Sequence, residues 1–308
     1  MLYLMKEIKL SYLRKNDKGG SKEHYWHFML GYLLPSLHHI LKVSDSGSAY
    51  SPKFVFEDCG PVMNHLIKEI AVLFSIQYRI EKPGAPHSEN VIVVPRWDIL
   101  LRRSFFFLIW RKRFVTDFSL RNSRNFRKRV RRSISIAQQS LQLRKDLLGV
   151  RDAILAKVDD LESAPSAGML LLKRSETPAF YSETGQARKK GYGNSRRSMI
   201  HLEEGMELLR EKGISATIYE PGKYSLVEQI HTFHNADGVV AIRGADLVNL
   251  LWTKPGSLVL MVNPMGKGSF HIYNYCCILK LFLVERLTET NFPSFLDFQF
   301  DKLIKTCA

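Results

Sequence analysis

The segment Ile242–Asn249 (IRGADLVN) has residue types that suit the binding of a phosphate group. An apolar strand precedes the small turn Gly244-Ala245, and a helical pattern follows it. At the carboxyl end of a strand in an α/β sheet, such a turn lets a ligand approach the backbone, and the helix start favours an anion. Arg243 adds a positive charge suited to a diphosphate. An ordinary tight turn with a surface arginine explains the same residues, and the pattern alone leaves both interpretations open.

Two residues of the first half could act as a general base. His27 lies in a predicted helix, and histidine side chains titrate near neutral pH, which suits proton abstraction. Asp58 follows Glu57 at the end of a short predicted strand, where a carboxylate would face a ligand. Each has a structural alternative, because His27 could be a hydrogen-bonded, half-buried histidine and Asp58 could cap the helix that begins at Pro61.

The elements that must position these residues alternate between strands and helices in the second half. Ser225 and Glu228 form a predicted capping box, and Gly213 has the position of a glycine that ends a helix. Alternation at this spacing predicts an α/β domain with a parallel sheet and helices on both faces. The predicted strands cover 169–173, 214–219, 238–242 and 257–262, and the last long helix covers 271–286.

In the first half, a helix over 23–34 ends or kinks at Pro35, because proline lacks a backbone N–H. Further predicted elements are strands at 53–56 and 90–94 and helices at 61–74 and 133–161. The segment Leu161–Gly168 (LESAPSAG) has the composition of a linker. We therefore expect two domains, 1–160 and 161–308.

The segment Tyr224–Pro264 resembles the signature of the glycosyltransferase 61 family, which is also found in capsular polysaccharide enzymes. Two departures from the pattern matter: Arg243 occupies the usual position of a histidine, and Asp246 stands where a small residue is common. The matching residues are Glu228, Gln229, Ala236, Gly244, Ala245, Leu247, Asn249, Trp252, Pro255 and Gly256.

The resemblance extends upstream. Arg174 and Arg197 match the arginines of two preceding segments, although His201 and Leu202 replace the Asn-Glu that usually follows the second one. Nearer the N-terminus, the segment His24–Leu37 is similar to a family pattern that contains a tyrosine and a histidine. Gly31 replaces the acidic residue of that pattern. The matches there are Tyr25, His27 and Leu33.

The resemblance implies a GT-B-like α/β fold, with two Rossmann-like domains facing a central cleft. The first domain would receive the acceptor, and the second would bind the nucleotide sugar. It also implies an inverting glycosyltransferase of polysaccharide biosynthesis, which moves a sugar from a nucleotide-diphosphate donor, with a UDP-sugar favoured, to a glycan or glycoprotein hydroxyl. The alternative is a catalytically degenerate relative that binds a glycan or nucleic acid through its basic segment.

The resemblance also implies a role for each candidate site residue. Inversion needs one base, His27 or Asp58, while the diphosphate leaves from the opposite face of the sugar. For Glu228, we favour the capping box over a contact with the donor ribose. The sequence lacks an obvious Asp-x-Asp motif, so we expect transfer without a metal or other cofactor. The expected donor-binding residues are Arg174, Arg197, Glu228, Arg243, Gly244, Ala245 and Asn249.

The net charge of +15 is concentrated in one place. The segment 101–132 contains twelve basic residues, one acidic residue and seven aromatic residues, and the remainder has 33 basic and 29 acidic residues. Such a basic, aromatic segment could be a solvated connection, which we favour, or could contact an anionic membrane surface. An acidic glycan would also be attracted. Nucleic acid is the least favoured partner.

No apolar run approaches the roughly 18 residues that a membrane span needs, and the N-terminus lacks the core of a signal peptide. Four cysteines without a CxxC pair argue against a disulfide framework and against structural zinc. We therefore expect a chain that is cytoplasmic or peripheral to a membrane.

Overall fold

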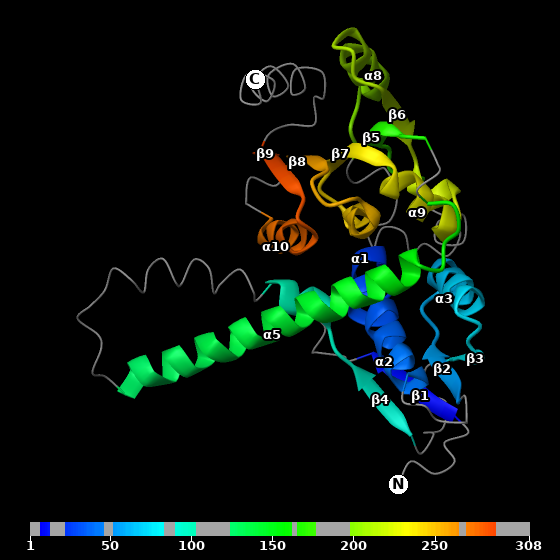
Figure 1. Ribbon diagram of the computed structural model, residues 1–308, viewed down its shortest axis with the longest axis vertical. Coiled ribbons are helices and arrows are strands. Elements are labelled where there is room, and N and C mark those ends of the chain that lie inside the picture. The colour runs from blue at the N-terminus through cyan, green and yellow to red at the C-terminus, as the bar shows by residue number, and fades with distance from the viewer. Residues whose placement is uncertain are drawn as a thin grey trace. The chain divides into compact units, whose positions relative to one another are not determined.

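A computed structural model gives the architecture of the chain (Figure 1). It describes residues 7–12, 22–45, 52–82, 90–102, 124–161, 165–176, 198–264 and 269–287. The chain divides into two compact units, Met1–Lys157 and Val158–Ala308. Each unit contains one parallel sheet. The expected α/β class is therefore confirmed.

The sheet of the first unit has the strand order β3-β2-β1-β4. The central strand β1 was not expected from the sequence, although its residues alternate between buried and half-exposed, as a strand with one polar face does. Strand β3 was not expected either. The strands are β1 (Glu7–Tyr12), β2 (Lys53–Glu57), β3 (Tyr78–Glu81) and β4 (Val91–Val94).

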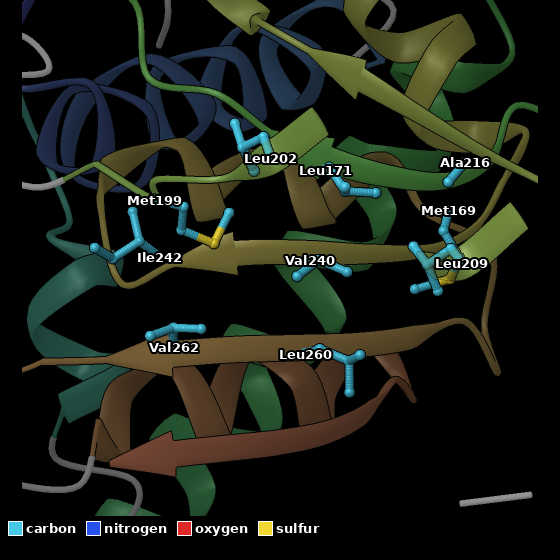
Figure 2. Close-up of a cluster of buried hydrophobic side chains, with 10 residues drawn as sticks. All are labelled: Met169, Leu171, Met199, Leu202, Leu209, Ala216, Val240, Ile242, Leu260 and Val262. Carbon is cyan, nitrogen blue, oxygen red and sulfur yellow. The ribbon is translucent and has the colours of Figure 1, made fainter. Parts of the chain in front are cut away.

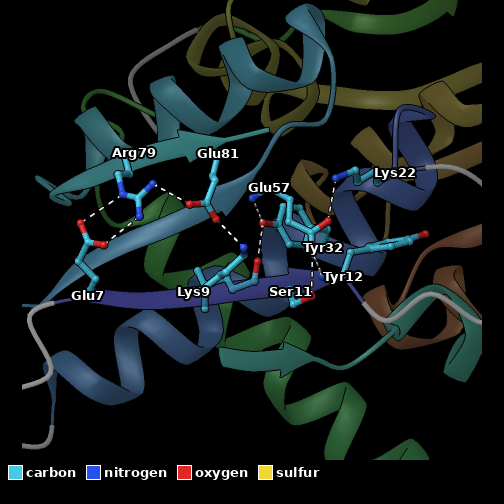
Figure 3. A network of polar contacts seen from close by, with 10 residues as sticks. Glu7, Lys9, Ser11, Tyr12, Lys22, Tyr32, Glu57, Arg79 and Glu81 are labelled. Carbon is cyan, nitrogen blue, oxygen red and sulfur yellow. Dashed lines mark hydrogen bonds and ion pairs between the residues drawn. The ribbon is translucent and has the colours of Figure 1, made fainter. Parts of the chain in front are cut away.

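Charged residues on β1 to β3 pair with one another across the strands (Figure 3). Arg79 contacts Glu7 and Glu81, and Lys9 forms an ion pair with Glu81. Arg79 and Glu81 on β3 thus reach Glu7 and Lys9 on β1 across the intervening strand β2. These pairings explain how a strand with charged side chains can lie in the middle of this sheet.

A continuous helical segment follows β1. It consists of α1 (Tyr25–Phe28), a π-helical turn η1 (Met29–Leu33) and α2 (Leu34–Ser44). The Leu34 N–H donates to the Met29 carbonyl, five residues back, just before Pro35. The wider turn precedes the proline, and the helix then continues instead of ending. The Tyr32 hydroxyl donates to the Leu10 carbonyl at 2.9 Å and accepts the Glu57 N–H, which ties the segment to the sheet.

Two further helices complete the described part of the first unit. Helix α3 (Pro61–Leu73) begins after Gly60, whose φ of 84° suits glycine. Helix α5 (Arg124–Leu155) starts nine residues earlier than expected and packs against α2. Among the side chains of α5 that the structure describes, the buried apolar ones recur at helical spacing, and they are Leu143, Leu147, Val150 and Ile154.

The second unit contains a five-stranded parallel sheet with the order β6-β5-β7-β8-β9. Its strands are β5 (Gly168–Leu172), β6 (Ala216–Tyr219), β7 (Ala236–Ile242), β8 (Leu258–Asn263) and β9 (Phe282–Leu287). Its helices are α8 (Leu202–Glu211), η4 (Pro221–Lys223), α9 (Leu226–His234), η5 (Ala245–Trp252) and α10 (Phe270–Leu279). The expected helix end at Gly213 is confirmed, since this residue has a φ of 75°.

Strands β5, β7 and β8 are almost entirely buried, as central strands of a parallel sheet covered on both faces should be. One face packs against α8 (Figure 2). Because β5, β7 and β8 are parallel neighbours, the residues that follow them leave the same edge of the sheet. The cluster consists of Met169, Leu171, Met199, Leu202, Leu209, Ala216, Val240, Ile242, Leu260 and Val262.

Two expected elements differ in the structure. The last long helix over 271–286 was wrong, because α10 ends at Leu279, Lys280 adopts a φ of 57°, and the chain then forms β9 beside β8. The helical pattern expected after the Gly244-Ala245 turn is a 3₁₀ helix that begins at Ala245. Within the described ranges, no helix is long and apolar enough to span a membrane.

Candidate functional site

Two of the predicted arginines leave the second sheet at the same edge. Strands β5 and β7 pair in parallel with Leu171 opposite Val240. Arg174 and Arg243 each lie three residues beyond this pair, at the carboxyl ends of the strands. In an open α/β sheet this edge is where ligands bind.

Arg174 forms an ion pair with Asp246, with 3.6 Å between Nε and Oδ2. Asp246 lies in the first turn of η5 and keeps 31% of its side-chain surface accessible. Packing around the carboxylate raises its pKa, and Arg174 opposes that rise. An acidic side chain at a helix start occupies the position that an anionic ligand would favour. A bound diphosphate would therefore compete with Asp246 for Arg174.

Gly244 leaves the backbone beside these charges open. Its φ of −167° is extended, so its conformation does not require glycine. A Cβ at this position would meet Asp246 Oδ2 at 3.9 Å and Arg174 Cζ at 4.0 Å, which are ordinary contacts. Gly244 and the half-buried Ala245 thus present backbone near Arg174, as binding of a phosphate group requires.

A hydrogen-bond network holds Arg243. Its guanidinium donates to Asn263 Oδ1 at 3.4 Å, and Asn263 is fully buried at the end of β8. The Asn263 amide nitrogen in turn donates to Glu285 at 2.5 Å and to the Ser269 hydroxyl at 3.1 Å. Asn263 was not singled out in the sequence, although it follows an apolar strand of the same sheet.

The other two predicted donor residues have partners inside the unit. Glu228 forms the expected capping box, accepting the Ser225 N–H at 2.8 Å. The hydrogen bonds from Ser225 lower the pKa of Glu228. Asn249 is fully buried, and its amide donates to Gln229 Oε1 at 2.9 Å. A donor contact for either residue stays a prediction. Arg197 lies outside the described residues.

In the first unit, His27 hydrogen-bonds to a buried carboxylate. Its Nδ1 lies 2.7 Å from Asp98 Oδ2, and 17% of its side-chain surface is accessible. Arg96 Nε donates to the other oxygen of Asp98 at 2.7 Å. Burial raises the pKa of Asp98, but the bonds from Arg96 and His27 outweigh it and hold the pKa below its usual value. Asp98 is therefore an ionised partner for His27.

Gly31 makes room for this arrangement. A Cβ on Gly31 would lie 2.8 Å from Arg96 Nε and 3.0 Å from Asp98 Oδ1. The Arg96 guanidinium also lies over the Tyr12 ring, 4.4 Å from its centroid. Asp98 and Arg96 thus occupy the space that a side chain at position 31 would need. Arg96 and Asp98 follow the buried end of β4, and this position was the sequence signal that could have identified them.

Asp58 is part of the loop between β2 and α3. Its Oδ1 accepts the Gly60 N–H at 2.9 Å and the Asn64 amide at 2.8 Å, and these bonds lower its pKa. The preceding Glu57 accepts from Lys22 and Ser11, both at 2.7 Å (Figure 3). These contacts give Asp58 a structural role in this loop, although α3 begins after Gly60 without the side-chain cap that was considered. Its role as a base stays a prediction.

Comparison with family models gives a match to the model described as Glycosyltransferase 61, over residues 25–260. The matched range includes His27, Asp98, Arg174 and Arg243. Comparison with curated proteins gives no match.

Proposed function

Since the chain belongs to the glycosyltransferase 61 family and is therefore a glycosyltransferase, we propose that it transfers a sugar from a UDP-sugar to a hydroxyl of a glycan or glycoprotein. We further propose that its two units are the domains of a GT-B enzyme, with the donor bound by the second. The observation that carries this proposal is the placement of Arg174, Arg243 and the Gly244 backbone at one carboxyl edge.

The proposed role of this edge is to bind the diphosphate and stabilise it as it leaves. Negative charge grows on the leaving group, and fixed cations and N–H donors lower the energy of that charge. Arg243 is held by Asn263, so its charge is oriented before the donor arrives. Arg174 would exchange Asp246 for the diphosphate, and Arg197 would add a third cation. With cations supplied by arginines, we propose that transfer needs no metal.

The proposed base is His27. Because a carboxylate only accepts hydrogen bonds, Nδ1 of the neutral imidazole carries the proton in the bond to Asp98, and Nε2 is left with its lone pair. Nε2 takes the acceptor hydroxyl proton while that oxygen bonds to the anomeric carbon. The bond from this carbon to the diphosphate breaks on the opposite face, which inverts the configuration.

Replacement of the base tests this role. We expect His27→Ala to lower the rate of UDP release from a UDP-sugar in the presence of acceptor by about a hundredfold or more, the usual contribution of a positioned base. UDP binding, measured by calorimetry, should not change. His65→Ala is a matched control, since His65 is exposed on α3. If His27→Ala retains normal turnover, the proposed base becomes Asp58.

A further inference from the structure

Two tyrosine rings are stacked at the carboxyl end of β6. The Tyr219 and Tyr224 ring centroids are 4.7 Å apart, with 12° between the planes. Tyr219 is 5% exposed and packs edge-on against Phe233. Tyr224 is 44% exposed. The outer ring is therefore an accessible aromatic surface that rests on a buried one.

This pair lies beside the proposed diphosphate site. The Lys173 N–H donates to the Tyr219 carbonyl at 2.9 Å, and Arg174 is the next residue. Gly222 lies close to the same segment, since a Cβ there would clash with Ser175 Oγ. In the order β6-β5-β7, the edge carries first the tyrosine pair, then Arg174, then Arg243. Neighbouring strands lie about 4.8 Å apart, so the end of β6 that carries Tyr219 is roughly 5 Å from the end of β5 and roughly 10 Å from the end of β7.

The backbone of Tyr224 is linked through Gln229 to η5, the helix that follows Gly244. The Gln229 amide donates to the Tyr224 carbonyl at 3.0 Å, and Gln229 in turn accepts from Asn249 on η5. Ser225, the next residue, caps α9. The tyrosine is thus held in a defined position relative to the start of η5.

We propose that the exposed face of Tyr224 stacks on the nucleobase of the donor, an inference that rests on the proposed function. In a nucleotide, the ribose separates the base from the diphosphate, and the tyrosine pair has the matching position one to two strands from the arginines. Aromatic side chains stack on bases with little dependence on base identity. Tyr224 would therefore contribute affinity for the nucleotide without selecting among uracil, guanine and cytosine.

Calorimetry of the full chain with UDP and with inorganic pyrophosphate tests this role. Pyrophosphate reports on the arginines alone, and UDP carries no donor sugar. We expect Tyr224→Ala to weaken UDP binding on the order of tenfold, because base stacking contributes about 1–3 kcal/mol. Pyrophosphate binding should be unchanged, and Tyr224→Phe, which retains the ring, should bind both ligands like the wild type.

Each contrary outcome has a separate meaning. Equal UDP affinity of the wild type and Tyr224→Ala would overturn the stacking role and leave the proposed function intact. Equal losses of UDP and pyrophosphate in Tyr224→Ala would also overturn it, because they would show a structural effect. If the wild type binds none of UDP, GDP, CMP and pyrophosphate, both the stacking role of Tyr224 and the proposed function are overturned. A loss seen only with the sugar-bearing donor would assign Tyr224 to the sugar.

Discussion

At the scale of single residues, the site of the first unit depends on one buried ionic arrangement. Asp98 accepts from both Arg96 and His27, and Arg96 and Asp98 are almost fully buried. Removing one member of a buried pair is more damaging than removing a surface pair, because the remaining charge keeps its desolvation cost. Asp98 therefore orients His27 and also stabilises the fold around it.

Substitution of this carboxylate should affect both stability and turnover. We expect Asp98→Asn to lower the free energy of unfolding by about 3 kcal/mol, measured by urea denaturation, because Arg96 loses its counter-charge. Turnover at a temperature where the variant is folded should fall by at least about tenfold, because the amide can present an N–H to Nδ1 and no longer fixes the tautomer. Unchanged stability and turnover would contradict the assignment.

The same carboxylate predicts a pH dependence of stability. The folded-state pKa of Asp98 is lowered, so its contribution is present above the unfolded pKa of about 3.9. It is lost as the pH falls through the lower, folded pKa. The difference in unfolding free energy between wild type and Asp98→Asn should therefore be constant near neutral pH and shrink below about pH 4.

At the scale of elements, the second sheet was largely predictable, whereas only β2 and β4 of the first sheet were predicted. The predicted strands 169–173 and 238–242 are mostly apolar runs between turn residues, and such runs indicate buried strands without further information. Strand β1 carries Glu7 and Lys9, which are tolerated because residues about 72 positions away supply their partners. Strand β9 likewise depends on pairing with β8, which overrides a helical pattern.

The residues of the candidate site also differ in how far local sequence could predict them. Arg174, Arg243 and Gly244 directly follow predicted strands, so local sequence was enough to place them at one edge. The contact between His27 and Asp98 joins residues 71 positions apart. Asn263 gains its role only because β8 lies beside β7. Such contacts arise from strand order, which single-sequence patterns do not specify.

Asn249 on η5 contacts Gln229 on α9. Substitution of Asn249 can therefore distinguish a structural role of this residue from a role in donor binding. Asn249→Ala leaves the buried amide of Gln229 without one partner, so we expect the free energy of unfolding to fall by about 1–3 kcal/mol. Thermal or urea denaturation measures this loss. A variant with wild-type stability and weakened UDP binding would instead support the donor contact.

At the scale of the whole molecule, the excess positive charge lies in two places, and a different partner is proposed for each. Most of the excess of +15 belongs to the segment 101–132, of which 103–123 lie outside the described residues. Arg174 and Arg243 belong to the second unit, where the proposed partner is a diphosphate. Among the partners considered for the basic segment, an anionic membrane surface suits its mixture of cations and aromatic residues best.

Flotation with lipid vesicles tests this partner. We expect the chain to float with vesicles containing phosphatidylserine, and to stay unbound with neutral vesicles or at 1 M salt, where charge attraction is screened. Reversal of Arg111, Lys112 and Arg113 to glutamate should weaken flotation. The same change at Lys68, Lys145 and Lys157, which are exposed elsewhere, controls for net charge. Equal losses in the two triple variants would contradict a specific role for the segment.

The central claim, that the carboxyl edge of the second sheet binds the donor diphosphate, is tested most directly by calorimetric titration of UDP into wild type and Arg243→Ala. We predict that the variant binds UDP about ten- to a hundredfold more weakly, as expected for the loss of a hydrogen bond to a charged group. Arg210→Ala, which removes an exposed arginine of α8, should bind like the wild type. Equal UDP affinity of Arg243→Ala and wild type would contradict the claim.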